Sequence, residues 1–197
     1  TDFRRPPIQN FEGRHVDVFI DDTHTQALTQ IASGMEGTLY GVLAGAIDIL
    51  LNKLSGKEDV ILGTTVAGRR HADLENVIGM FVGTLPLRNR PEQGKTVDTF
   101  LREVKDTTLA AMENQEYPFE ELVDKLDIPR DMGRNPLFDV MFTMQNIAEK
   151  GRTGKTNESG DGRLTLNPIA KFDLTFTVRE TLDGLGIKVD YAAALFK

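Results

Sequence analysis

Side chains that could act as a base or a nucleophile are few in this sequence. It contains three histidines (His15, His24 and His71), three serines and no cysteine. Hydrolysis and acyl transfer need a nucleophile or a base with a partner, so these residues are the first candidates for chemistry. His15 lies beside the start of a predicted strand and His24 in the first turn of a predicted helix, so both are expected at the surface. His71 lies in the predicted loop "AGRRHADLE", a better position for chemistry.

No known catalytic motif surrounds these side chains. None of the serines lies in a G-x-S-x-G sequence, and no complete G-x-x-x-x-G-K-[ST] sequence is present that would bind phosphate. The glycines of "IGMFVGT" do not follow a phosphate-binding spacing, and no histidines and acidic residues have the spacing of a metal site. Taken alone, the sequence predicts neither a complete active site nor a metal site.

Composition argues against two classes of partner. The formal net charge of -7 disfavours a nucleic-acid groove, which needs clustered Lys and Arg to neutralise phosphates. The uncharged apolar run from Gly37 to Ile47, like every other uncharged run in the sequence, is far shorter than the ~18 residues of a membrane span. The absence of cysteine fits a reducing compartment. We therefore expect a cytoplasmic globular protein that binds neither nucleic acid nor membranes.

The elements that must position any site are mixed. Helices are expected after Asp22, Thr38 and Thr96, whose side chains can cap them, and a short one after Pro118. The helix after Thr38 is apolar on most sides and is expected to be buried. Apolar runs predict strands at residues 14–20, 60–68, 84–88 and 137–146, followed by a hairpin at 172–191 that turns near Asp183-Gly184. Interspersed helices and strands favour an α+β fold with a mixed sheet.

The length of 197 residues suits one large domain or a substantial piece of one. Residues 1–13 are expected to form an extended N-terminal segment. Residues 149–163 contain four glycines and no apolar anchor, so we expect a mobile surface loop there. Because the chain begins without Met, we expect it to be part of a longer protein.

Five motifs occur in order along the chain: "DVILGTTVAGRR", "VIGMFVGTLPLR", "NQEYPFEELV", "RDMGRNPLFDVMF" and "KFDLTF". From Thr1 to Lys197 the chain thereby resembles the C-terminal half of a condensation domain of nonribosomal peptide synthetases, multidomain enzymes of bacterial antibiotic biosynthesis. The resemblance implies a fold similar to that of chloramphenicol acetyltransferase, with two lobes in a V and an active-site tunnel between them. The implied C-terminal lobe is a mixed β-sheet flanked by helices.

The resemblance also implies a reaction and its partners. An acceptor aminoacyl amine attacks a donor peptidyl thioester, and both substrates are carried on the 4'-phosphopantetheine of neighbouring carrier domains. The catalytic H-H-x-x-x-D-G motif lies in the N-terminal lobe, and no adjacent His pair occurs in this chain. We therefore assign no catalytic residue here and expect the chain to be inactive alone. Its expected partners are the N-terminal lobe, peptidyl carrier domains and an adenylation domain, with no directly bound cofactor.

Three positions early in the chain gain a role from the resemblance. Arg69 matches the arginine of the family's S-G-R sequence, which pairs with the aspartate of the catalytic motif, although Ala67 replaces the serine. Arg69 is therefore expected to support the active site, the alternative being an ordinary loop arginine. Gly83 replaces the asparagine of the family's "FVNT", which removes any side-chain contact there. Gly83 and Thr84 remain candidates to face the tunnel through their backbone.

Arg134 and Asn135 are the second pair of candidates for contact with substrate or carrier. Pro136 restricts Asn135 to an extended or turn conformation. The alternative for this pair is an Asn-Pro turn braced by Asp131. A mature lobe of this family would also continue with another helix and an Arg-containing segment.

Two other functions remain open. The chain could be a docking module for carrier or adenylation domains without chemistry of its own, or a stand-alone acyltransferase that uses His71. A cut between lobes would also expose surface around "VIGMFVGTLPLR" and "NPLFDVMFTM", from which we expect weak self-association of the isolated chain.

Overall fold

The computed structural model describes residues 1–69, 71–74, 76–145 and 169–197. The expected mobile loop at 149–163 lies outside these residues. The helices are α1 (Asp22–Gly34), α2 (Leu39–Ser55), the 3-10 turn η1 (Ala72–Leu74), α3 (Val97–Glu113) and α4 (Phe119–Lys125). The strands are β1 (Gly13–Asp21), β2 (Val60–Val66), β3 (Gly83–Asn89), β4 (Val140–Gln145), β5 (Leu174–Thr181) and β6 (Gly184–Ala192).

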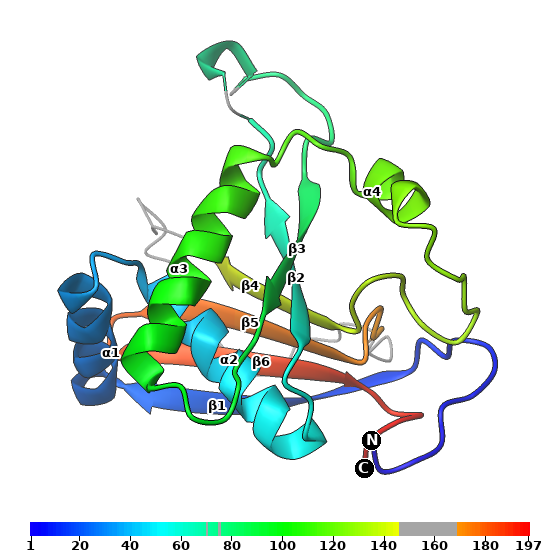
Figure 1. Ribbon diagram of the computed structural model, residues 1–197, viewed down its shortest axis with the longest axis horizontal. Helices are drawn as coiled ribbons and strands as arrows, with labels where there is room; N and C mark the ends of the chain where they lie inside the picture. Colours follow the sequence, from blue (N-terminus) through cyan, green and yellow to red (C-terminus); the bar gives the residue numbers. More distant parts are fainter. Residues whose placement is uncertain (70, 75, 146–168) are drawn as a thin grey trace, which may run out of the picture.

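The six strands in the described part of the chain belong to one sheet in the order β1-β6-β5-β4-β2-β3. β4 runs parallel to both β2 and β5, whereas β1–β6, β5–β6 and β2–β3 are antiparallel pairs. The β5–β6 hairpin turns at Gly184, whose φ of 142° suits glycine, as the Asp183-Gly184 pair predicted. The predicted α+β class with a mixed sheet is confirmed (Figure 1).

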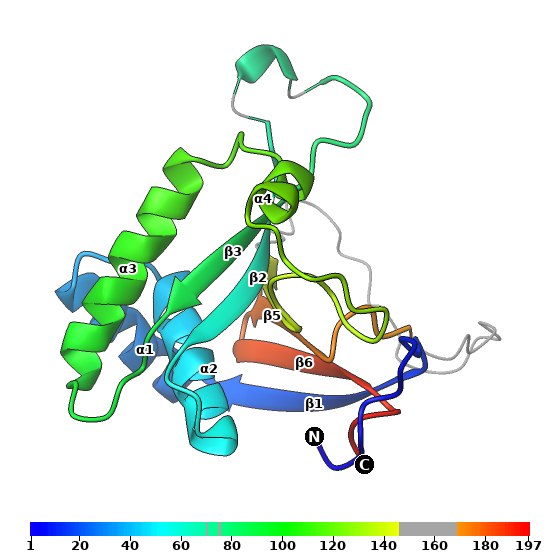
Figure 2. The same ribbon diagram turned by 45° about the vertical axis from the view of Figure 1, so that its right-hand side comes forward.

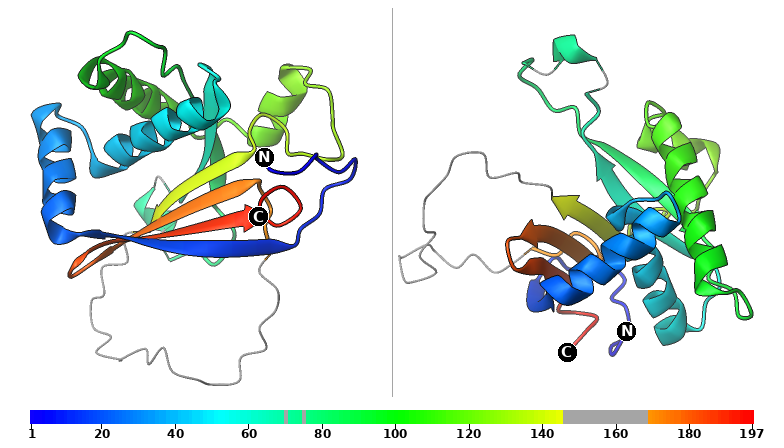
Figure 3. Two further views of the ribbon diagram at one scale, coloured as in Figure 1. Left: turned by 90° about the horizontal axis from the view of Figure 1, so that it is seen from below. Right: turned by 90° about the vertical axis from the view of Figure 1, so that its left-hand side faces the viewer.

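Helices α1, α2 and α3 lie together on one side of the sheet, as the view from below shows (Figure 3). The β2–β3 hairpin rises from the other strands and passes beside α3 (Figure 2). The main core forms between these layers, where the fully buried side chains include Leu62 of β2, Val104 of α3, Phe142 of β4 and Leu185 of β6. Alternation along the strands explains this placement, because every second side chain points toward the helices.

Helix starts follow the predicted caps closely. The side chains of Thr38 and Thr96 accept backbone N–H groups at the starts of α2 and α3. At α1 the cap is Asp21 rather than Asp22, because Asp21 is the residue in extended conformation and accepts from the His24 backbone. The prediction that α2 is buried on most sides is wrong at its C-terminal end, where Leu54 is 76% exposed.

The predicted strand at 137–146 is shorter than expected. β4 begins at Val140, because the Asn135-Pro136 turn and the positive φ of Leu137 (66°) delay the extended backbone. Phe138, Met141 and Phe142 are buried, so the expectation that this segment adds to an exposed apolar surface is wrong for these three side chains.

The two ends of the described chain meet (Figure 1). The backbone N–H of Asp2 donates to the Leu195 carbonyl at 2.8 Å, and Asp2 accepts from the Lys197 N–H at 2.9 Å. Within residues 1–12 there is no helix or longer strand, only a single bridge between Glu12 and Ile169.

Among the described residues, no single helix is long and apolar enough to span a membrane, and α1 with α2 qualifies only as a pair bent by 103°.

Candidate functional site

The connection between β2 and β3, residues 67–82, projects from the body of the lobe at the top of Figure 1 and is called here the hairpin loop. The side chain of Arg69 lies inside this loop and contacts several of its residues. Its guanidinium donates to the carbonyl oxygens of Leu74, Val77 (2.8 Å) and Gly79 (3.2 Å), and it lies 4.2 Å from the centroid of the Phe81 ring. All of these contacts are inside the loop, so Arg69 shapes the loop without fixing it to the sheet.

Gly68 explains why glycine precedes this arginine. Its φ is +65°, in the left-handed region, and a Cβ at this position would collide with the carbonyl oxygen of Phe81. The two ends of the hairpin loop can therefore approach closely only with glycine at residue 68. Gly83 and Thr84, the next candidates, lie at the start of β3 opposite Val66 and Thr65 of β2.

Large apolar side chains of the hairpin loop are exposed. Ile78 is 101% exposed, Met80 90% and Val82 62%. Scattered apolar residues are normal on surfaces, but three within five positions of one projecting loop indicate a contact surface.

The three histidines are all on the surface. His15 and His24 are exposed, as predicted. The side chain of His71 is 73% exposed, and its Nδ1 lies 3.3 Å from Oδ2 of Asp73, which is 88% exposed. A carboxylate partner is thus present, but His71 lines none of the five best-formed cavities, and within the described residues no group of three or more metal-binding side chains is found.

A cleft of about 880 Å³ separates α4 from residues 128–139, which are called here the cleft loop. Its apolar lining includes Ile61 of β2, Phe119 and Val123 of α4, and Phe138. The Phe138 ring contacts Phe119 at a centroid distance of 5.6 Å and lies directly against Gly63, where any Cβ would overlap it. This volume is typical of sites for small ligands or side chains.

Arg134 and Asn135 line this cleft, apart from the other candidates. Arg134 forms a two-point ion pair with Asp139, and the hydrogen bonds that it donates to that carboxylate raise the pKa of the guanidinium. The Asn135 amide donates to the Lys171 carbonyl at 2.7 Å. Asp131 accepts the Gly133 N–H at 2.8 Å, so it braces the turn that leads into Asn135 and Pro136.

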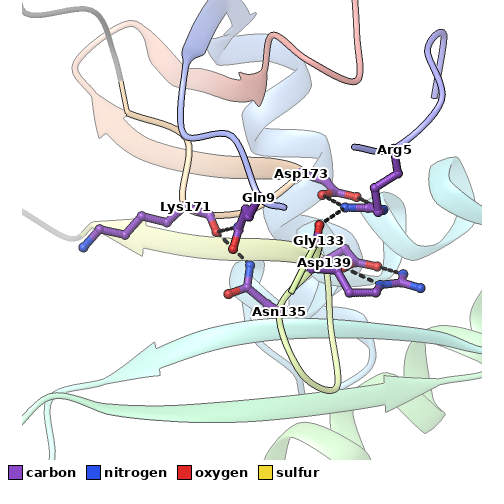
Figure 4. A network of polar contacts seen from close by, with 8 residues as sticks. Arg5, Gln9, Gly133, Asn135, Asp139, Lys171 and Asp173 are labelled. Carbon is purple, nitrogen blue, oxygen red and sulfur yellow. Dashed lines mark hydrogen bonds and ion pairs between the residues drawn. The ribbon is translucent and has the colours of Figure 1, made fainter. Parts of the chain in front are cut away.

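The cleft loop is held from behind by the N-terminal segment (Figure 4). Arg5 forms a two-point ion pair with Asp173 and also donates to the Gly133 carbonyl at 3.1 Å. Gln9 donates to the Lys171 carbonyl at 2.9 Å, so Gln9 and Asn135 meet on one oxygen. The side chains of Arg5 and Asp173 are 25% and 13% exposed.

Arg5 and Asp173 were not predicted as site residues. Asp173 belongs to the motif "KFDLTF", which was a usable signal, whereas "TDFRRPP" showed only charge and proline. The predicted candidates themselves fall into two groups: Arg69, Gly83 and Thr84 at the hairpin loop, and Arg134 and Asn135 at the cleft.

Sequence comparison identifies relatives along the full length. A family model described as "Condensation domain" matches residues 1–197. Tyrocidine synthase 3 of Brevibacillus parabrevis is 46% identical over 204 residues, and gramicidin S synthase 2 of Brevibacillus brevis is 44% identical over 197 residues. Each alignment covers 100% of this chain but only 3% and 4% of the relative, so the chain spans a small part of those proteins.

Solved structures share the fold at lower identity. A four-domain nonribosomal peptide synthetase bound to AMP and glycine matches with a TM-score of 0.85 and 22% identity, over 100% of this chain and 16% of that chain. The X-domain from teicoplanin biosynthesis matches with a TM-score of 0.83 and 22% identity, over 100% of this chain and 45% of that one. Both likenesses concern the fold, which is the chloramphenicol acetyltransferase-like fold expected from the motifs. The full-length family match and the relatives above 40% identity show that this chain belongs to the condensation-domain family of nonribosomal peptide synthetases.

Proposed function

We propose that this chain is the C-terminal lobe of a condensation domain that forms peptide bonds between carrier-bound substrates. The acceptor amine nitrogen bonds to the donor carbonyl carbon, the carbon–sulfur bond breaks, and the phosphopantetheine thiol leaves with the proton given up by the amine. One observation carries the proposal: the family match extends over residues 1–197, while the chain covers only 42% of a solved condensation domain of the CDA synthetase.

The base for this reaction is assigned to the other lobe. The histidines of this chain are exposed, and His71 lines none of the five best-formed cavities of the described residues. A general base must lie within hydrogen-bond reach of the proton it removes, in a site that holds the substrate. The chain alone is therefore expected to be inactive, and its part is to complete the tunnel.

Arg69 and the hairpin loop are proposed as the contribution to that tunnel. Three of the five guanidinium N–H groups bond to loop carbonyls, which leaves Nε–H and one Nη2–H without a partner among the described residues. A carboxylate from the N-terminal lobe could accept both in a two-point pair. The exposed Ile78 and Met80 beside them would become buried against the same lobe.

The remaining candidates are assigned to substrates and carriers. The backbone of Gly83 and Thr84 is proposed to face the phosphopantetheine arm of a loaded carrier domain. Arg134 pairs with Asp139 and Asn135 bonds to the Lys171 carbonyl, so we assign both to the wall of the cleft rather than to substrate. Carrier and adenylation domains of the same synthetase are the proposed partners, and the reaction is placed in the cytoplasm.

A docking role without chemistry is the second candidate function. The fold also occurs in an X-domain solved in complex with OxyB, with a TM-score of 0.84 and 22% identity. A domain that contains this fold can thus form a complex with another protein.

Reconstitution separates these possibilities. The isolated chain and the intact condensation domain that contains it are each mixed with two loaded carrier domains, and dipeptide is measured by mass spectrometry. We expect product only from the intact domain, and we expect His71→Ala in that domain to leave the rate unchanged. His71-dependent product from the isolated chain would establish the stand-alone acyltransferase. Carrier binding without product from the intact domain would establish the docking role.

A further inference from the structure

A polar pair is buried where α2 meets β3, away from both candidate regions. The carboxyl of Asp48 is 0% exposed and Asn89 is 4% exposed. Asn89 Nδ2 donates to Asp48 Oδ2 at 2.7 Å. Buried polar side chains are normally satisfied by hydrogen bonds, so the remaining atoms of this pair need an account.

The other two side-chain oxygens of the pair accept no hydrogen bond from the described residues. Asp48 Oδ1 and Asn89 Oδ1 are both buried and have no hydrogen-bond partner among the described residues. An ionised carboxylate offers no donor, and the oxygen of an amide only accepts. One additional proton on the carboxyl converts the two unsatisfied acceptors into a donor and an acceptor.

No cation of the described residues compensates a charge at this position. Among the described residues Asp48 forms no ion pair, and no Lys or Arg affects its pKa. The titratable group that interacts with it is Tyr40, on the same helix; β3 supplies the neutral Asn89, and no titratable group of β2 or α3 affects the carboxyl. Burial raises the pKa of the Tyr40 phenol to about 12, so Tyr40 stays neutral near pH 7.

We propose that Asp48 is a neutral carboxylic acid in the folded chain and that its O–H donates a hydrogen bond to Asn89 Oδ1. Acid and amide then form a pair with two hydrogen bonds. Loss of the proton leaves a buried negative charge with one hydrogen bond. The contribution of this pair to the stability of the fold is thereby smaller at high pH than at low pH. This inference is independent of the proposed peptide-bond chemistry.

The direction of the pH effect follows from the two states of Asp48. Burial raises the pKa of its carboxyl to about 7 in the folded chain, despite the opposing hydrogen bond from Asn89. In the unfolded chain the value is about 4. The stabilisation is fully present below about pH 4 and is lost as the pH rises to about 7. In that window the folding equilibrium constant falls about tenfold per pH unit and then levels off.

Denaturant unfolding of the full chain tests the proposal in wild type, Asp48→Asn and Asp106→Asn. An asparagine at residue 48 can form the same two hydrogen bonds with Asn89 at every pH, because it carries the needed N–H permanently. Wild type and Asp48→Asn should be about equally stable near pH 4. At pH 8 the folding equilibrium constant of Asp48→Asn should exceed that of wild type by up to about a thousandfold. Asp106 is an exposed carboxyl on α3, so its variant controls for the loss of one charge.

Parallel pH profiles for wild type and Asp48→Asn would overturn the proposal, as would an Asn variant that is less stable than wild type at pH 8. Infrared spectroscopy gives a second readout that does not depend on the variant folding. At pH 6 the folded wild type should show the carbonyl band of a protonated carboxyl, and this band should disappear by about pH 8.5, above the folded pKa. A wild type without this band at pH 6 would also overturn the proposal.

Discussion

The hairpin loop and the cleft loop each depend on arginine, but they use it in opposite ways. In the hairpin loop, Arg69 reaches carbonyl oxygens five, eight and ten positions away. Behind the cleft loop, Arg5 reaches the carboxylate of Asp173 across 168 positions of sequence. A local set of bonds gives a loop its shape, whereas a long-range ion pair fixes separate segments to one another.

The two loops also differ in how far their apolar side chains are buried. The hairpin loop leaves Ile78 and Met80 exposed, while the cleft loop places Phe138, 4% exposed, between the rings of Phe119 and Phe172. Changes at the cleft should therefore alter the stability of the isolated chain. Changes at the hairpin loop should alter what the chain does with its partners.

The largest effect on the stability of the isolated chain is expected from Phe138→Ala. Removing a buried aromatic ring leaves a cavity and should lower the free energy of unfolding by about 3–5 kcal/mol. Met80→Ala, at the hairpin loop, should change it by less than about 0.5 kcal/mol because the side chain is 90% exposed. Urea unfolding of both variants makes the comparison, and similar losses in the two would contradict it.

Arg69→Ala should reduce condensation by the intact domain by on the order of 100-fold, because a displaced loop misplaces the groups it supports. Arg69→Lys should recover little of this rate, since a lysine cannot reproduce the fork of N–H groups. Single-turnover dipeptide formation measures the rate, and urea unfolding of the isolated chain should show almost no change. Wild-type rates in both variants would make Arg69 an ordinary loop arginine.

Arg5→Ala should destabilise the isolated chain by about 2 kcal/mol, since it leaves the mostly buried Asp173 carboxylate without its charged donor. The matched control is Arg130→Ala, whose ion pair with Asp124 is exposed on both sides (82% and 70%). Thermal or urea unfolding should show a clear loss for Arg5→Ala only. Equal stability of the two variants would mean that the N-terminal segment does not hold the cleft loop.

The smallest effect concerns self-association of the isolated chain. We expect weak association through the exposed hairpin loop, because contiguous apolar side chains on a free surface tend to associate. Replacing Ile78 and Met80 by serine should weaken it by about 1 kcal/mol or more. Sedimentation velocity over a concentration series measures this, and a wild type that remains monomeric throughout would refute the expectation.

Much of the local structure was readable from the residue pattern. Thr38 and Thr96 cap the helices they were predicted to cap, and the Asp183-Gly184 hairpin forms as expected. Errors occurred where local rules compete, as at residues 137–139, where apolar residues suggested strand but the Asn-Pro turn prevails. The order of the five motifs also sufficed to identify the family.

Contacts between distant segments were not readable in this way. Caps, turns and alternation act over a few residues, so they leave a signal in the sequence around them. The meeting of Arg5 with Asp173, or of Asp48 with Asn89, depends instead on the order of strands in the sheet and on the side of it that the helices cover. The sequence by itself determined the elements and the family of this protein, and only the tertiary structure decided which charged groups are paired and which acid is buried, because burial and pairing are properties of the assembled layers.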